Sequence, residues 1–187
     1  MIQNKVIIFP TDTVYGIGAS IYDVEGMDRI YEIKHRDRSK PLAVLCANIE
    51  QIESIAYVSD NARKLINKFL PGGLTIILKS KTSILETFKG ETVGVRIPNY
   101  DVALDILSLY GPMATTSVNE SGKPSINNYN EIVKDYSNLV DEIHKPSNCE
   151  TSSLASTVVL ITDTNEVKIL REGAITKEMI EKCLKEE

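Results

Sequence analysis

The stretch Phe9-Pro10-Thr11-Asp12-Thr13-Val14-Tyr15-Gly16-Ile17-Gly18 begins with the last residue of an apolar run, residues 6–9. This run predicts a buried strand. Pro10 ends that strand, because proline has no N–H group to offer a sheet. Two hydroxyls, a carboxylate and two glycines follow, and they predict a polar turn whose oxygens and backbone N–H groups can reach a ligand. An ordinary strand-to-helix connection, in which the glycines supply turn dihedral angles, explains the same residues.

Helices and strands alternate irregularly along the rest of the chain. Periodicity and capping residues predict helices at residues 23–33, 48–55, 60–69, 101–109 and from 176 onward. Apolar runs predict strands at residues 42–46, 75–78, 92–97 and 113–118, and a hairpin of strands 157–161 and 167–170. Residues 125–151 are polar and loosely patterned, with one candidate strand at 139–143. The expected fold is α/β, a single domain over residues 1–187 with one twisted, open, mixed sheet flanked by helices.

Composition narrows the class of protein. The net charge is −5, from 21 basic and 26 acidic residues, which argues against broad, non-specific nucleic-acid binding but leaves room for a local basic pocket. Cys46, Cys149 and Cys183 lie far apart, without the spacing of a zinc site or a redox pair. No secretory signal and no run long enough to span a membrane is present. We therefore expect a cytoplasmic protein without a membrane partner.

A basic stretch, residues 34–40, follows the first predicted helix and precedes a buried strand. Lys34, Arg36 and Lys40 would suit a polyphosphate, because α/β sheets bind ligands at strand ends. The same cations could instead favour the helix macrodipole or simply keep the surface soluble. No Walker A loop and no dinucleotide glycine motif offers another phosphate site, and His35 and His144 are expected on the surface.

Two further polar features interrupt apolar strands. Arg96 lies between Val95 and Ile97, where an unpaired arginine would be costly to bury, so it predicts a carboxylate or phosphate contact. An edge strand with Arg96 facing water is the alternative. The second feature is the cluster Ser117-Val118-Asn119, whose hydroxyl and amide could hold phosphate oxygens or an amino-acid head group, or could form a hydrogen-bonded turn.

Seven short motifs follow one another along nearly the whole chain. They are Pro10-Thr11-Asp12-Thr13-Val14-Tyr15-Gly16, Lys34-x-Arg36 with Lys40-Pro41-Leu42, Leu70-Pro71-Gly72-Gly73-Leu74-Thr75, Val93-Gly94-Val95-Arg96-Ile97-Pro98, Ser117-Val118-Asn119-Glu120-Ser121-Gly122, Ser156-Thr157-Val158-Val159 and Leu170-Arg171-Glu172-Gly173-Ala174-Ile175. In this order the chain resembles the threonylcarbamoyl-AMP synthase family, the YrdC-like domain. Each motif is modest alone, whereas seven in the family's order are specific.

The resemblance implies an enzyme that makes threonylcarbamoyl-adenylate and pyrophosphate from L-threonine, bicarbonate and ATP, with Mg²⁺ carried by ATP and no protein-bound metal. It also implies a twisted α/β sheet around a deep basic cavity. The family's catalytic residues would be Lys34, Arg36, Ser117 and Asn119. Its ATP contacts would be Arg36, Lys40, Thr92, Ser117, Ser125 and Arg171, and its threonine contacts Thr13, Arg96, Thr115 and Ser156. Downstream, the resemblance implies threonylcarbamoyladenosine formation in tRNA by separate transfer proteins.

Some positions depart from the family pattern, and two other functions remain alternatives. Asp37 and Glu172 stand where many members have proline, and Leu45 stands where many have a histidine against threonine. A paralogue that transfers a carbamoyl group to another acceptor is therefore one alternative. An RNA-binding module of the same fold, acting on tRNA, double-stranded RNA or ribosomes, is the other, although the net charge of −5 disfavours it.

Overall fold

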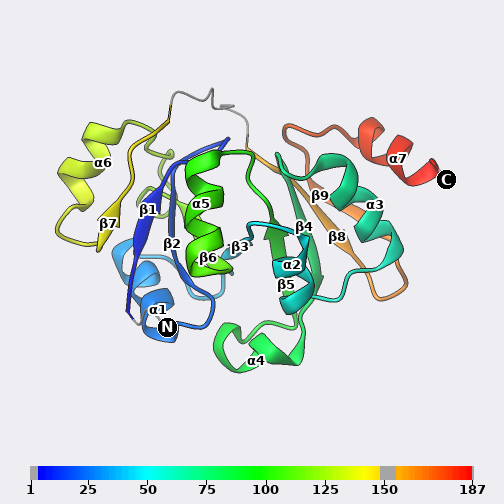
Figure 1. Ribbon diagram of the computed structural model, residues 1–187, viewed down its shortest axis with the longest axis horizontal. Helices are drawn as coiled ribbons and strands as arrows, with labels where there is room; N and C mark the ends of the chain where they lie inside the picture. Colours follow the sequence, from blue (N-terminus) through cyan, green and yellow to red (C-terminus); the bar gives the residue numbers. More distant parts are fainter. Residues whose placement is uncertain (1–3, 148–154, 187) are drawn as a thin grey trace.

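The computed structural model describes residues 4–147 and 155–186 (Figure 1). Its strands are β1 (Ile7–Phe9), β2 (Gly16–Ser20), β3 (Ala43–Leu45), β4 (Leu74–Lys79), β5 (Thr92–Arg96), β6 (Met113–Ser117), β7 (Glu142–Ile143), β8 (Thr157–Ile161) and β9 (Val167–Arg171). Its helices are α1 (Val24–Ile33), α2 (Ile49–Ile55), α3 (Asp60–Phe69), α4 (Thr82–Phe88), α5 (Asp101–Tyr110), α6 (Tyr129–Tyr136) and α7 (Lys177–Lys185).

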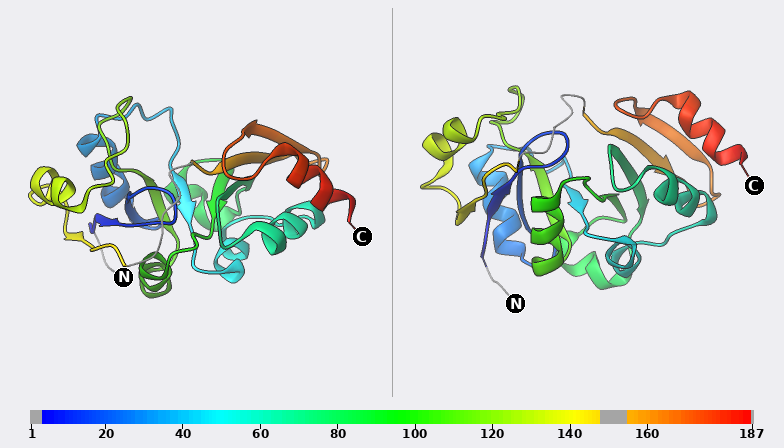
Figure 2. Two further views of the ribbon diagram at one scale, coloured as in Figure 1. Left: turned by 90° about the horizontal axis from the view of Figure 1, so that it is seen from above. Right: turned by 45° about the horizontal axis from the view of Figure 1, so that its top comes forward.

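The nine strands form one sheet in the order β7-β1-β2-β6-β3-β5-β4-β8-β9. The pairs β1–β7, β3–β5 and β4–β8 are parallel and the other pairs are antiparallel. Figure 2 shows α6 and β7 at one end of the molecule, with α7 and the β8–β9 hairpin at the other. The predicted α/β fold with one mixed, helix-flanked sheet is therefore confirmed.

Helices cover the two halves of the sheet differently. In the β1–β2–β6 half, Ile8 and Ile17 pack with α1 and α6 on one face, while Ile7 and Phe9 pack with α5 on the other. The β3–β5–β4–β8 half packs one face against α2, α3, α4 and α7. Its opposite face, which carries Gly94, remains partly exposed to solvent, and this difference leaves a stretch of sheet accessible to a ligand.

Residues 16–20 form strand β2, so the alternative in which Gly16 and Gly18 supply turn dihedral angles is wrong; the bend is confined to residues 12–14. Gly18 lies opposite Thr115 of β6. A Cβ atom would lie 2.7 Å from Thr115 Cγ2 if added to Gly16, and 2.8 Å from Thr115 Oγ1 if added to Gly18. Glycine is therefore needed at both of these strand positions, because the side chain of Thr115 fills the space that a Cβ atom would occupy.

Two helices lie where the sequence predicts none. Helix α4 has seven residues and α6 has eight, and neither carries a long apolar stripe. The Asn128 side chain caps α6 by accepting a hydrogen bond from the backbone N–H of Glu131 at 3.1 Å. The candidate strand at residues 139–143 is confirmed only for Glu142 and Ile143, which pair with β1.

The free thiols of Cys46 and Cys183 are both buried, and burial raises the pKa of each above its ordinary value. Both thiols are therefore protonated at neutral pH, which makes them poor nucleophiles and poor metal ligands. Cys149 lies outside the described residues. Among the helices that the structure describes, none has the length and apolar character needed to cross a membrane.

We expect Gly18→Ala to lower the free energy of unfolding by about 1–3 kcal/mol, because the new methyl group would overlap Thr115 and the Phe9 ring. Gly94→Ala is the matched control, since a Cβ there meets Thr75 and Ile77 at ordinary contact distances of 3.5 and 3.6 Å. Urea unfolding of both variants measures the difference. Equal losses in the two proteins would contradict the packing assigned to Thr115.

Candidate active site

Arg96, at the end of β5, is buried, with only 6% of its surface exposed. Its guanidinium donates from Nη2 to Asp12 Oδ1 at 2.6 Å, from Nη1 to Thr13 Oγ1 at 2.9 Å, and from Nε to the Gly72 carbonyl at 2.9 Å. Strand β5 lies inside the sheet, between β3 and β4, so the alternative of an edge strand with Arg96 facing water is wrong. Arg96 thus connects the motif after β1 with the turn before β4.

Among the described residues, the Arg96 guanidinium has fewer hydrogen-bond partners than donors. A guanidinium has five N–H groups, and the contacts with described residues occupy three of them. The ion pair with Asp12 offsets the cost of burying the charge, so the side chain is held in place before any ligand arrives. The two remaining N–H groups suit a planar carboxylate.

Three hydroxyl groups predicted to contact threonine are also buried. Thr13 touches Arg96 directly, as described above. Thr115 Oγ1 donates to the Met113 carbonyl at 3.0 Å, and Ser156 Oγ lies 2.9 Å from Thr75 Oγ1. The structure therefore buries all four predicted threonine contacts and brings two of them into direct contact; no contact of Thr115 or Ser156 with Arg96 is among those of the described residues.

Leu45 is the neighbour of Arg96 on the adjacent strand, β3. It is buried in the apolar cluster beneath α5, together with Phe9 and Met113. Leu45 therefore gives this side of the site an apolar wall, where a histidine would supply a polar ring.

Lys34 ends helix α1 and is buried, with 1% of its surface exposed. Its ammonium donates to the Asn119 carbonyl and Oδ1, each at 2.8 Å, and to the Ser117 carbonyl. Ser117 Oγ in turn donates to Asn119 Oδ1 at 2.7 Å. Lys34, Ser117 and Asn119 thus form one hydrogen-bonded unit, in which the three ammonium N–H groups all point at protein oxygens.

Burial lowers the pKa of Lys34 from 10.5 to about 8, and the nearby Arg36 contributes to the same shift. Desolvation disfavours the charged amine, and a second cation adds repulsion. The sequence predicts Lys34 as a member of a cation cluster for phosphates. In the structure its ammonium points at the loop after β6. Contact of Lys34 with phosphates stays a prediction.

The other predicted ATP contacts lie nearer the surface. Arg36 is half-buried, and its guanidinium donates to the carbonyls of Lys40 and Pro41 at 3.1 and 3.0 Å. Lys40, Thr92 and Ser125 are exposed. Thr92 shares a cavity of about 490 Å³ with Ser39 and Pro41, which brings it beside the basic stretch, and no hydrogen bond among the described residues links it to Arg96.

Arg171, on the edge strand β9, folds back over Ser156. Its Nη2 donates to the Ser156 carbonyl at 2.8 Å and lies 3.3 Å from Ser156 Oγ. One predicted ATP contact and one predicted threonine contact are therefore adjacent in space. The deep basic cavity that the resemblance implies remains a prediction.

Sequence reasoning assigned no role to three groups that belong to the site. They are the carboxylate of Asp12, the carbonyl of Gly72 and the hydroxyl of Thr75. Asp12 carried a detectable signal, because a buried arginine requires an anionic partner and Asp12 is the acid inside the opening motif. The Gly72 carbonyl and the Thr75 hydroxyl gave no such signal, since their roles depend on how distant segments pack.

Comparisons with curated proteins give relatives that match almost the entire chain. A "Putative threonylcarbamoyl-AMP synthase" of Methanocaldococcus jannaschii is 37% identical over 183 residues, which is 98% of this chain and 86% of the relative. The threonylcarbamoyl-AMP synthases of Pyrococcus abyssi and Bacillus subtilis are 34% and 37% identical over 98% and 96% of this chain. The chain spans about half the length of those two relatives, 55% and 53%.

Solved structures and a family model agree with these relatives. The crystal structure of P. abyssi Sua5 complexed with L-threonine has a TM-score of 0.88 and 34% identity, covering 97% of this chain and 54% of that one. Escherichia coli YciO has a TM-score of 0.80 and 27% identity, covering 91% and 84%. The family model Sua5_yciO_yrdC, described as "Telomere recombination", matches residues 1–173. The resemblance carried by the seven motifs is thereby confirmed, and the chain belongs to the Sua5/YciO/YrdC family.

Proposed function

We propose that the protein is an L-threonylcarbamoyladenylate synthase, a nucleotidyltransferase that makes threonylcarbamoyl-AMP and pyrophosphate from L-threonine, bicarbonate and ATP. The observation that carries this proposal is the buried Arg96 guanidinium, which Asp12, Thr13 and Gly72 hold, while two of its N–H groups contact no other described residue and suit a carboxylate. The names of the M. jannaschii and P. abyssi relatives, and the L-threonine complex of P. abyssi Sua5, support it.

In this scheme the site first binds the amino acid. Arg96 pairs with the threonine carboxylate, while Thr13, Thr115 and Ser156 orient the remainder of the molecule. The threonine amine adds to carbon dioxide and releases one proton, forming a carbamate. A carbamate oxygen then attacks the α-phosphorus of ATP, and the new P–O bond forms as the bond to pyrophosphate breaks.

Arg36, Lys40 and Arg171 are the side chains proposed to bind the triphosphate, with Thr92 and Ser125 as further contacts. Magnesium enters as part of the MgATP substrate, bound through phosphate oxygens. Lys34 holds Ser117 and Asn119 in place, and the loop that carries them would orient the reacting groups. Positioning and charge stabilisation would then carry most of the catalysis.

An amino acid other than threonine is a second candidate for the substrate. Leu45 puts an apolar wall beside Arg96, and this favours a member that accepts another small amino acid in addition to, or in place of, threonine. Four further points stay predictions. They are the use of the adenylate for threonylcarbamoyladenosine in tRNA, direct binding of tRNA or double-stranded RNA, the downstream transfer proteins, and a cytoplasmic location.

Pyrophosphate release should require ATP, L-threonine and bicarbonate together, and should fall to background when carbon dioxide is excluded. The reason is that the carbamate, rather than threonine's own carboxylate, is the nucleophile. The measurement is pyrophosphate release in degassed buffer, followed by restoration of bicarbonate. Serine and valine, assayed beside threonine, test the role of Leu45.

The outcomes of this experiment separate the candidates. Full pyrophosphate release without bicarbonate would identify an ordinary amino-acid adenylating enzyme and rule out the carbamate route. Bicarbonate-dependent release that serine or valine supports better than threonine would keep the chemistry and change the substrate. Labelled bicarbonate recovered in an adenylate that also contains threonine would support the full proposal.

A further inference from the structure

The segment that leads into β4 contacts both sides of the candidate active site. The Gly72 carbonyl accepts a hydrogen bond from Arg96 Nε at 2.9 Å. Three residues later, Thr75 Oγ1 lies 2.9 Å from Ser156 Oγ, at the start of β8. Residues 72–75 therefore connect the arginine proposed to bind a carboxylate with the serine predicted to contact the same amino acid.

Thr75 lies on the same face of the sheet as Arg96. Ile76 of β4 pairs with Val95 of β5, and both side chains belong to the core cluster on the other face. Because side chains alternate along a strand, Thr75 and Arg96, the residues next to this pair, both point away from that core in neighbouring positions. A Cβ atom added to Gly94 would lie 3.5 Å from Thr75 Cγ2, so the methyl group of Thr75 faces β5. Its hydroxyl faces β8.

The hydroxyl oxygen of Ser156 has two polar neighbours, which come from the strands on either side of β8. Thr75 Oγ1 lies 2.9 Å away on β4, and Arg171 Nη2 lies 3.3 Å away on β9 (Figure 1). A guanidinium can only donate, so Arg171 occupies one lone pair of Ser156 Oγ. The direction of the hydrogen bond between Thr75 and Ser156 then decides whether Ser156 has a hydrogen left for a ligand.

Burial determines this direction. Thr75 is 7% exposed, and its hydroxyl has no second hydrogen-bond partner among the described residues. A buried hydroxyl hydrogen requires an acceptor, and Ser156 Oγ is the acceptor that the described residues offer to Thr75. When Thr75 donates, both lone pairs of Ser156 Oγ are occupied and the Ser156 hydrogen remains for a ligand. The opposite direction would leave the Thr75 hydrogen without an acceptor in this part of the chain.

We infer that Thr75 is a positioning residue, which donates to Ser156 and thereby makes the Ser156 hydroxyl a hydrogen-bond donor to the amino-acid carboxylate bound at Arg96. This inference rests on the proposed function. Arg171 does not depend on Thr75 in the same way, because its Nη2 and Nε also donate to the Ser156 carbonyl, at 2.8 and 3.2 Å. Loss of the Thr75 hydroxyl should therefore affect the amino acid and spare ATP.

The test measures the affinities for L-threonine and for MgATP separately, by calorimetry on the intact chain. Thr75→Val keeps the shape of the side chain and removes the hydroxyl, so it should weaken threonine binding about five- to tenfold and leave ATP binding within about twofold. Thr75→Ser keeps the hydroxyl and should restore threonine affinity to within about twofold of wild type. Thr162→Val is the matched control, because its hydroxyl lies 2.9 Å from that of Thr164 just beyond the other end of β8; it should alter neither affinity.

A double variant tests whether Thr75 acts through Ser156. Ser156→Ala should weaken threonine binding by about the same five- to tenfold, and Thr75→Val added to it should cost less than about a further twofold.

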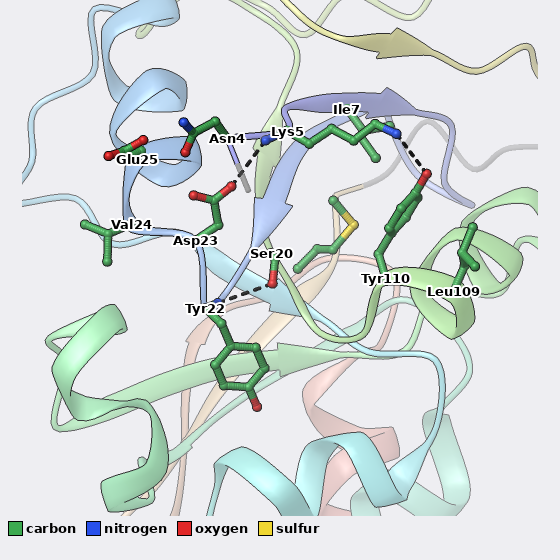
Figure 3. Close-up of a pocket in the computed structure, with 11 residues that line it drawn as sticks. Asn4, Lys5, Ile7, Ser20, Tyr22, Asp23, Val24, Glu25, Leu109 and Tyr110 are labelled. Atoms are coloured by element: carbon green, nitrogen blue, oxygen red, sulfur yellow. Dashed lines mark hydrogen bonds between the residues drawn. The ribbon is translucent and has the colours of Figure 1, made fainter. Parts of the chain in front are cut away.

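Ser20→Ala is the control for the serine substitution and should leave threonine affinity unchanged. Ser20 accepts a hydrogen bond from the Tyr22 backbone N–H at 3.3 Å, beside a separate cavity of about 580 Å³ (Figure 3). It lies at the end of the β2–β6 ladder opposite Ser117. Thermal unfolding checks that each variant is folded, and Thr75→Ala replaces Thr75→Val, with the same expected loss, if the valine variant does not fold.

The outcomes separate this inference from the proposed function. Wild-type threonine affinity in Thr75→Val, no recovery in Thr75→Ser, or losses that multiply in the double variant would overturn the inference and leave the proposed function standing. Equal losses of threonine and ATP affinity in Thr75→Val would assign Thr75 to the fold alone and overturn it as well. A wild-type protein that binds neither threonine, serine nor valine would overturn the proposed function, and this inference with it.

Discussion

Arg96→Lys will weaken L-threonine binding by about one to two orders of magnitude, which corresponds to roughly 1.5–3 kcal/mol, and will leave ATP binding within about threefold. Lysine keeps the positive charge, but it cannot reproduce a planar fork that contacts Asp12, Thr13 and Gly72 and still offers two N–H groups to a carboxylate. Isothermal calorimetry with each ligand separately measures the two affinities, and thermal unfolding checks that the variant is folded.

The matched control is Arg63→Lys. Arg63 lies on the surface of α3, where its guanidinium pairs with Glu53, so the same substitution there should alter neither affinity. Equal losses of threonine and ATP binding in Arg96→Lys would assign Arg96 to the fold or to the phosphates, and the threonine site would have to be sought elsewhere.

Lys34→Met should lower turnover by about a hundredfold or more, because Ser117 and Asn119 lose the cation that positions them. The free energy of unfolding should also fall, by about 2–4 kcal/mol, since three buried oxygens lose a donor while the cost of burying a charge is removed. Urea unfolding and steady-state kinetics measure the two effects. Lys68→Met, an exposed lysine of α3, is the control.

The pH dependence of Lys34 has a definite sign. Its pKa is lowered to about 8 in the folded protein and remains near 10.5 in the unfolded chain. Between these values the unfolded state binds more protons, so the stability of the wild type relative to Lys34→Met rises with pH. Turnover should instead fall as the pH passes about 8, because the neutral amine has only two N–H groups for three acceptors. A turnover that is flat from pH 7 to about 9.5 would contradict this positioning role.

Much of the sheet could be predicted because a buried strand requires a run of apolar residues, which is visible in the local sequence. The sequence segments that form β1, β3, β4, β5, β6, β8 and β9 are apolar runs bounded by turn residues. The hydrophobic pattern and the composition of each segment are therefore sufficient to predict a strand. Strand β2 has no such run. Its glycines are explained by the Thr115 side chain opposite, on a strand almost a hundred residues later, and no local pattern contains that information.

The candidate site divides in the same way. Arg96 could be predicted as a buried, paired arginine from its apolar neighbours alone. Lys34 could be selected, but its task could not, because a lysine at a helix end has the same local sequence whether it points to solvent or into the loop after β6. The partners Asp12, Gly72 and Thr75 are defined by contacts between segments far apart in sequence.

The strand order also determines when the chain can fold. Three of the eight neighbouring pairs, β1–β2, β4–β5 and β8–β9, join strands that are consecutive in sequence. The others close long loops, such as Ile7 with Glu142 and Leu74 with Thr157, and the entropy of loop closure must be overcome before those contacts form. During synthesis, strand β2 therefore has one unpaired hydrogen-bonding edge until β6 has been made. Strand β4 likewise has one unpaired edge until β8 has been made. The nascent protein stays prone to mispairing until nearly its last strand has left the ribosome.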